Sequence, residues 1–151
     1  HNTKGVYSEK PHDYYELMQR LRRKIDGARD ELPAPILREE EECEIGIIYL
    51  GSMENTIQEI DDILENTVIK VSQCRVRALP MHSEVENFIR RHEMTIVLEI
   101  NRDGQLYGIL RKELPNDLIT KVRSVAYSDG VPPRAGIYAE RILETLKEEG
   151  Q

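Results

Sequence analysis

The fold is decided by residues 44–105, which read EIGIIYLGSMENTIQEIDDILENTVIKVSQCRVRALPMHSEVENFIRRHEMTIVLEINRDGQ. Apolar runs of strand length alternate with apolar stripes at helical spacing, which predicts strand, helix, strand, helix, strand. A polar or glycine-containing corner follows each strand, at residues 51–55, 78–83 and 101–105. In an open parallel sheet such corners gather at the edge where ligands and partners usually bind. None of the three corners holds an obvious catalytic set.

The same reading extends to the end of the chain. Strands are expected over residues 44–50, 69–76, 94–100 and 121–126. Helices are expected to begin at Ser52, at the capping pair Ser83 and Glu86, at Gly104 and at Pro132-Pro133. Strands and helices that alternate at these lengths predict a three-layer αβα fold, doubly wound around a mainly parallel sheet.

Residues 1–43 follow a different pattern. Asp13 can cap a helix that carries one apolar stripe, made of Tyr14, Leu17, Leu21, Ile25, Ala28 and Leu32. Pro33 and Pro35 end that helix, and residues 36–42 are expected to be a solvated acidic connector. We therefore divide the chain into a linker and helical arm (1–43), which packs against a neighbouring domain or subunit, and an α/β domain (44–151). The chain begins at His1 without Met, so we expect it to be part of a longer polypeptide.

Length and charge limit the function classes. A chain of 151 residues with 39% hydrophobic content can bury a core without metal or disulfide support. A net charge of -7 argues against a nucleic-acid or anionic-membrane surface, because either would repel most of the exterior. No apolar run reaches the roughly 18 residues that a membrane span needs. We expect a soluble cytoplasmic protein.

The two cysteines are expected to be buried and reduced. Cys43 enters the first strand and Cys74 lies well along the second, so their thiols would be at different heights in the sheet, which disfavours a disulfide. Neither cysteine belongs to a Cys-x-x-Cys pair or has a histidine at zinc-ligand spacing. A metal site or iron–sulfur cluster is therefore not expected from this chain alone.

Two pairs of residues could contact an anion. Gly51 and Ser52 follow a strand and precede a helix, but one glycine without a Gly-x-Gly-x-x-Gly pattern favours a tight turn with a helix cap over a weak anion contact. Arg75 and Arg77 alternate onto one face near the end of the second strand. They could bind a ribose phosphate, but without a glycine fingerprint they more readily reach an acidic partner surface or cover an exposed sheet face.

The remaining polar residues of the corners have structural interpretations as well. His82 precedes a helix N-cap and is exposed enough to meet a partner, whereas His12 and His92 are expected on the surface at helix ends. Asn101, Asp103 and Gln105 can cap and brace the third corner. No Ser-His-Asp or Cys-His pairing emerges, so no catalytic residue is assigned.

Several segments resemble a known enzyme family. Residues 76–80 (VRALP) and 96–106 (IVLEINRDGQL) closely resemble the C-terminal domain of the alpha subunit of 2-oxoacid:ferredoxin oxidoreductases, particularly the 2-oxoglutarate type. The opening motifs His1-Asn2-x-x-Gly5 and Pro11-His12, with RRKI at residues 22–25, resemble the linker and helix that follow the pyrimidine-binding domain of those subunits. The resemblance spans nearly the whole chain, and its Asn-x-x-Gly-Gln corner is moderately specific.

The resemblance implies a domain similar to the transketolase C-terminal domain (core domain II), within an enzyme of the 2-oxoglutarate synthase type. Such an enzyme decarboxylates a 2-oxoacid on thiamine diphosphate, forms an acyl-coenzyme A and passes electrons through iron–sulfur clusters to ferredoxin. It implies that thiamine diphosphate, Mg and the clusters are held by the preceding alpha domain, the beta subunit and other chains. No catalytic, cofactor-binding or metal-binding residue transfers to this chain, so the isolated chain is expected to be inactive.

Two functions of different classes remain open. In the first, the chain is a non-catalytic assembly domain whose corners at His82 and at residues 101–105 contact the beta subunit or the preceding domain. In the second, it is a free-standing nucleotide or small-anion binding module that uses Gly51-Ser52 with Arg75 and Arg77. The absent glycine fingerprint favours the first.

Overall fold

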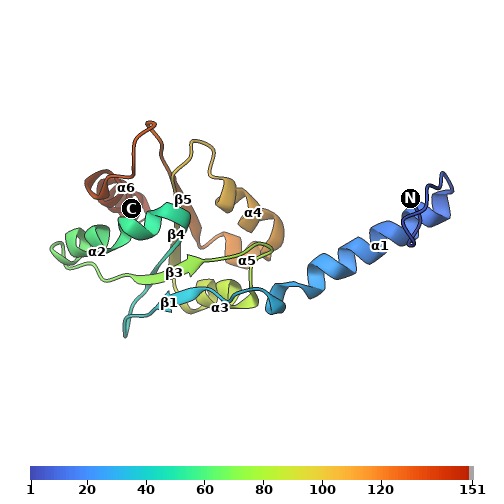
Figure 1. Ribbon diagram of the computed structural model, residues 1–151. Helices are drawn as coiled ribbons and strands as arrows, with labels where there is room; N and C mark the ends of the chain where they lie inside the picture. The colour runs from blue at the N-terminus through green and yellow to red at the C-terminus, as the bar shows by residue number, and fades with distance from the viewer. Residues whose placement is uncertain (150–151) are drawn as a thin grey trace.

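The computed structural model describes residues 1–149 as an α/β body from which one long helix projects (Figure 1). The body is built on a five-stranded sheet in the order β1-β3-β2-β4-β5. The strands are β1 (Ile36–Arg38), β2 (Ile45–Leu50), β3 (Ser72–Val76), β4 (Met94–Glu99) and β5 (Val122–Ala126). β2 pairs in parallel with β3 and β4, and β4 pairs in parallel with β5, whereas β1 is antiparallel to β3. The predicted mainly parallel α/β fold is therefore confirmed.

Helices cover both faces of the sheet. They are α1 (Pro11–Gly27), α2 (Ile57–Glu65), α3 (Ser83–Arg91), α4 (Gln105–Glu113), α5 (Asn116–Ile119) and α6 (Ala135–Glu149), with 3-10 turns η1 (Arg29–Glu31) and η2 (Gly51–Asn55). The side chains of α2 and α6 pack on one face, and those of α3, α4 and α5 pack on the other. Figure 1 shows the resulting three layers, with α1 outside them.

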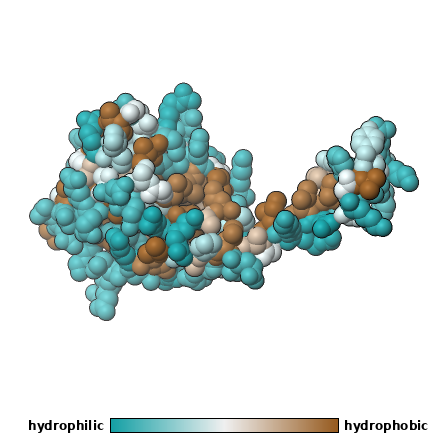
Figure 2. All heavy atoms as spheres, viewed as in Figure 1, coloured by the Kyte–Doolittle hydropathy of each residue, from teal (hydrophilic) through white to brown (hydrophobic). Residues whose placement is uncertain are grey.

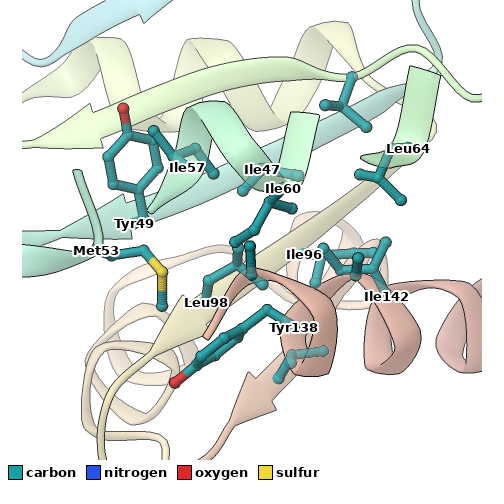
Figure 3. Close-up of a cluster of buried hydrophobic side chains, with 14 residues drawn as sticks. Ile47, Tyr49, Met53, Ile57, Ile60, Leu64, Ile96, Leu98, Tyr138 and Ile142 are labelled. Carbon is teal, nitrogen blue, oxygen red and sulfur yellow. The ribbon is translucent and has the colours of Figure 1, made fainter. Parts of the chain in front are cut away.

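The central strands are apolar at consecutive positions because both of their faces are buried. Ile47 and Tyr49 of β2 belong to the cluster formed with α2 and α6, and Figure 3 shows Ile47 beside Ile60 and Tyr49 beside Ile57. Ile48, the residue between them, joins the cluster on the opposite face. Each such side chain contributes about 1.5–3 kcal/mol through burial.

Gly46 of β2 brings α3 close to the sheet. A Cβ atom at this position would lie 2.6 Å from Cε1 of Phe88 and 3.2 Å from Cγ of His92. Any larger residue would push both rings, and α3 with them, away from β2.

β1 occupies part of the segment for which a solvated connector was predicted. Ile36, Leu37 and Arg38 pair with Arg75, Cys74 and Gln73, and Leu37 packs against the core beneath α3. Pairing satisfies the free backbone groups along the outer edge of β3. This gain outweighs the tendency of the acidic residues that follow to keep the segment in solvent. The sheet therefore begins at Ile36 instead of Glu44, while the proposed division of the chain at residue 44 stays a prediction.

Three expected caps and two expected helix boundaries differ in the structure. α1 begins at Pro11 with Lys10 as N-cap, and it ends at Gly27, before the predicted end at Leu32. Ser52 caps no helix, because a 3-10 turn intervenes and α2 begins after Thr56. The N-cap of α3 is His82 instead of Ser83, and α6 begins at Ala135, beyond the two prolines.

The base of α1 is fixed to the body, although none of the residues of α1 is buried. Arg29 pairs with Glu113 of α4 at 2.7 Å, and the Ser83 hydroxyl donates to Asp30 at 2.7 Å. Arg77 donates through Nε to the carbonyl oxygen of Ala34 at 2.6 Å. These contacts set the direction in which the helix leaves the body.

Candidate functional site

A small hollow opens at the carboxyl edge of the sheet between β2 and β4. The chain turns from β2 to β3 on one side and from β4 to β5 on the other, so this hollow lies at the topological switch point of the sheet. Its volume is about 190 Å³. It is lined by Leu50, Gly51, Ser52, Leu98, Glu99, Ile100 and Asn101. The structure thus brings the first and third predicted corners together.

Gly51 and Ser52 form one wall of this hollow. Gly51 has φ = 62°, a left-handed conformation that glycine adopts without strain. Apart from Gly51 and its two neighbours in the chain, no atom lies within 4 Å of the place where a Cβ would be. The glycine is therefore required for the turn and not for a close contact within the chain. The five-residue 3-10 turn that follows offers no helix terminus for an anion.

Glu99 lines the hollow, and its carboxylate caps α4. Only 3% of the residue is exposed. Its Oε1 accepts from the N–H of Leu106 at 2.6 Å and its Oε2 from the N–H of Tyr107 at 3.0 Å. A carboxylate in this place satisfies two free backbone donors and complements the positive end of the helix. The positive end of α4 is thereby occupied by a group of the protein itself.

Asn101 braces the third corner, as predicted. Its Oδ1 accepts from the N–H groups of Asp103 and Gly104 at 3.0 and 2.7 Å, and its Nδ2 donates to Glu99 at 2.9 Å. Gly104 is the N-cap of α4, with φ = 62°, so the predicted capping by Asn or Asp is replaced by Glu99. Asp103 forms an exposed pair with Arg102, and Gln105 is the first residue of α4.

Arg75 and Arg77 have partners within the chain. Arg75 lies 3.6 Å from Glu54, which also pairs with Arg38 at 3.3 Å. The Tyr49 hydroxyl donates to the same carboxylate at 2.7 Å. Burial, and then the neighbouring Glu54 carboxylate, raise the pKa of Tyr49. Arg77 holds the segment that leads into β1, so the two arginines are not joined in one anion site.

His82 is part of the junction between α3 and the base of α1. Its Nδ1 accepts from the N–H of Glu84 at 3.1 Å, and its Nε2 lies 3.9 Å from Asp30. The side chain is 17% exposed, which is less than the sequence suggested. The pKa of Asp30 is lowered, mainly because the hydroxyl and the backbone N–H of Ser83 donate hydrogen bonds to its carboxylate.

The packing of the fold accounts for the positions of Cys43, Cys74 and His92. Cys74 is fully buried, and this burial raises the pKa of its thiol to about 12. Cys43 is half-buried instead of buried, and its thiol approaches the carbonyl oxygens of Ile45 and Lys70 at 3.2 Å. His92 is buried against Phe88, contrary to the predicted surface position, because Gly46 leaves room for both rings.

Glu99 is the residue that the sequence interpretation missed. The signal is an acidic side chain inside the apolar run of residues 94–100, followed within seven residues by the start of a helix. Among residues 1–149, no group of three or more His, Cys, Asp or Glu side chains could hold a metal ion. Within the same residues, no helix combines the length and the apolar character needed to cross a membrane.

Two solved structures have the same arrangement of elements. One is the 2-oxoglutarate:ferredoxin oxidoreductase from Magnetococcus marinus, solved with 2-oxoglutarate, coenzyme A and succinyl-CoA bound; it matches 95% of this chain with a TM-score of 0.78 and 22% identity. The other is a split-gene transketolase in an inactive beta4 tetramer, which matches 74% of this chain with a TM-score of 0.53 and 18% identity. The chain shares their fold. The resemblance stated from the sequence is confirmed at this level.

The matched regions are parts of longer proteins. This chain spans 25% of the oxidoreductase chain and 41% of the transketolase chain. No protein-family model matches the chain. No curated protein matches its sequence.

Proposed function

We propose that this chain is an assembly domain of the alpha subunit of a thiamine diphosphate-dependent 2-oxoacid:ferredoxin oxidoreductase of the 2-oxoglutarate type. In this proposal other parts of the enzyme hold thiamine diphosphate, Mg and the iron–sulfur clusters, and bind coenzyme A and ferredoxin. The domain contributes surfaces that join the preceding domain and the beta subunit. The isolated chain then has no oxidoreductase activity.

The match to the oxidoreductase over 95% of the chain carries this proposal. That share leaves out no more than about eight of 151 residues, whereas α1 alone has 17. The similarity therefore includes most of the projecting helix as well as the α/β body. A helix with no packing in its own chain has little reason to keep the same position unless the same kind of neighbour uses it.

The second candidate, a free-standing nucleotide or small-anion module, has less support. The residues that it would use are engaged elsewhere: Arg75 with Glu54, and Arg77 with Ala34. The α4 terminus beside the hollow already holds the Glu99 carboxylate. A phosphate at this edge would face that carboxylate instead of free N–H groups.

The hollow at the switch point is the surface that we assign to the contact with the rest of the enzyme. Leu50 lines it and is 40% exposed, next to Gly51, Ser52 and Asn101. An apolar side chain with a polar surround is the usual composition of the centre of an interface. Leu50→Asp should therefore prevent assembly and leave the fold intact.

The test replaces the matched segment of the Magnetococcus marinus oxidoreductase with residues 1–149 of this chain. We expect the chimaera to assemble and to reduce an acceptor with 2-oxoglutarate and coenzyme A, and the Leu50→Asp chimaera to lose subunit association. Val131→Asp is the matched control, because Val131 is 51% exposed and lies outside the hollow. Failure of the chimaera to assemble, with both parts folded, would contradict the proposal.

A ligand titration separates the two candidates. A ligand at a hundred times its dissociation constant adds about 2.7 kcal/mol to the free energy of unfolding. We expect neither NADP nor thiamine diphosphate to change the melting temperature of the isolated chain. A clear increase with NADP would favour the nucleotide-binding module.

A further inference from the structure

A hollow of about 480 Å³ lies at the amino edge of the sheet, on the opposite side from the hollow at Leu50. It opens where β2, β3 and β4 begin, between the end of α3 and the loop of residues 39–44. We name it the His92 hollow, after a buried residue that lines it. Figure 1 shows the loop protruding from the body, and Figure 2 shows that the protrusion is hydrophilic. The volume lies within the range of about 300–1,000 Å³ that small-ligand sites occupy.

The imidazole of His92 presents a free acceptor to this hollow. The residue is only 4% exposed, and its Nδ1 lies 2.7 Å from the carbonyl oxygen of Phe88. A carbonyl oxygen only accepts, so Nδ1 carries the proton and Nε2 of the neutral ring keeps its lone pair. Among residues 1–149, the fully enclosed side-chain polar atom without a partner is Thr95 Oγ1, so Nε2 of His92, which has no partner either, retains an opening. Because His92 lines the hollow, this opening faces the hollow.

The border of the His92 hollow is strongly negative. Arg91 pairs with Glu39 at 2.9 Å and so neutralises one carboxylate. The other glutamates of the hollow form no ion pair with the residues that the structure describes, and Lys70 of the adjacent hollow does not change this. These glutamates are Glu40, Glu42, Glu44 and Glu93. A cation in the hollow would therefore meet carboxylates that the described chain does not neutralise.

The arrangement of these groups favours an organic cation over a metal ion. Within residues 1–149, no three His, Cys, Asp or Glu side chains converge as metal ligands, although all but aspartate line this hollow. A metal ion needs ligands at short and fixed distances. An ammonium or guanidinium group needs only acceptors around its N–H groups, and both a carboxylate and the free nitrogen of a neutral imidazole accept such bonds.

We propose that the His92 hollow binds a primary ammonium or guanidinium group, which donates an N–H to Nε2 of His92 and has its charge balanced by Glu42 and Glu93. This chemistry can come from a free small amine or from a lysine or arginine side chain of another part of the enzyme. The inference goes beyond the proposed function and does not depend on it, because it rests on groups of this chain alone.

The first test titrates the intact chain with agmatine, a probe that carries a guanidinium group at one end and an ammonium group at the other. Isothermal titration calorimetry should show saturable binding of a single agmatine per chain at millimolar concentrations. Mg²⁺, which has the same charge but requires converging ligands, is the control and should give no saturable heat. No saturable binding of agmatine, or equal binding of Mg²⁺, would overturn the proposal.

Charge removal locates the site. Glu42→Gln with Glu93→Gln should weaken agmatine binding about fivefold, because two partly solvated ion pairs with the probe are lost. Glu140→Gln with Glu144→Gln is the matched control, since it removes the same charge from exposed positions of α6. The control should bind agmatine as the unaltered chain does. Equal weakening in both double variants would show that binding follows net charge, and would overturn the assignment to the His92 hollow.

Nitrogen-15 NMR of the histidine rings tests the role of Nε2 without any substitution. Saturation with agmatine should move the Nε2 resonance of His92, whereas the ring of the exposed His12 serves as the internal reference. His92→Asn retains an N–H that can donate to the Phe88 carbonyl but removes Nε2, so affinity should fall about tenfold. If this variant does not fold, the NMR result decides alone. A His92 resonance that stays in place during saturable binding would overturn the proposal.

The oxidoreductase chimaera separates the two sources of the cation, and either outcome supports the site. If a side chain of the enzyme fills the His92 hollow, the assembled chimaera should no longer bind agmatine, and Glu42→Gln with Glu93→Gln should weaken its assembly. If the ligand is a free amine, the chimaera should bind agmatine as the isolated chain does. A chimaera that fails to assemble would contradict the proposed function, whose contact lies at Leu50, while titration of the isolated chain would still decide this inference.

Discussion

The backbone of Val68 has φ = 65°, a left-handed conformation that β-branched residues rarely adopt. It ends the turn after α2, where the N–H of Val68 donates to Glu65 and that of Ile69 to Leu64. Glycine is the usual residue at such a position. The exposed valine side chain gives the monomer no packing in return, which suits a surface that another molecule covers.

Val68→Gly should stabilise the monomer. Removing the left-handed strain of a β-branched residue gains more than the added backbone freedom of glycine costs, so we expect an increase of about 1 kcal/mol in the free energy of unfolding. Chemical denaturation measures it. Val131→Gly, at an exposed position with ordinary φ, is the control and should give no increase. An equal loss in both variants would contradict the strain argument.

Glu99 is the polar residue on which the third corner depends. Glu99→Gln keeps the shape but places an NH₂ group against a backbone N–H, so one acceptor and the charge at the start of α4 are lost. We expect a loss of about 2 kcal/mol in the free energy of unfolding, measured by urea denaturation. Glu86→Gln, a partly exposed change on α3, is the control. A loss no larger than that of the control would refute the capping role.

At the scale of elements, α2 and the segment after β1 bring carboxylates together around Asp61. Its pKa is raised in the folded state, so the charged form is disfavoured by folding and the native state loses stability as pH rises through this pKa. Asp61→Asn keeps the contact with Gln73 and removes the charge. We expect the variant to be more stable than the unaltered protein at pH 7.

Denaturation at pH 4 and pH 7 measures this difference in stability. The gain from Asp61→Asn should shrink toward pH 4, where protonation neutralises Asp61 in the unaltered chain as well. Glu59→Gln, an exposed change on the same helix, is the control and should show no comparable gain at pH 7. A gain independent of pH would point to packing instead of charge.

The elements that could be predicted from the sequence are those in which the pattern of apolar residues extends over many positions. β2 and β4 have continuous apolar runs, and the helices after them have buried residues at helical spacing, so local sequence alone identifies them. β1 could not be found, because three residues carry no period and pair only when the edge of β3 is in place. The capping role of Glu99 depends on a contact across seven residues that spacing rules for caps do not cover.

The candidate site was predictable only in part. Corners after β2 and β4 meet because parallel strands end at one edge, so Gly51, Ser52 and Asn101 could be placed together. The partners of Arg75 and Arg77 could not be foreseen, since Glu54 reaches Arg75 through a 3-10 turn and Ala34 reaches Arg77 through β1. The 3-10 turn and β1 both depend on tertiary contacts.

At the scale of the whole molecule, the projecting helix should be the part most open to proteolysis. Trypsin sites at Arg20, Arg22, Arg23 and Lys24 lie on a helix without buried residues, so local unfolding exposes them at little cost. In dilute solution we expect cleavage there first, followed by a stable body. Mass spectrometry of a digestion time course measures it. Equally fast cleavage at Arg90 or Arg91 of α3, the internal control, would contradict this prediction.

The three-residue strand β1 connects the helix α1 to the sheet, and this connection has a mechanical consequence. Tension applied to α1 by a bound partner loads Arg77 and Ala34 first and then the short ladder between β1 and β3. Peeling this ladder removes Leu37 from its place beside Cys74. A pull on the helix would therefore uncover a thiol that is shielded at rest, so alkylation of Cys74 would report the force.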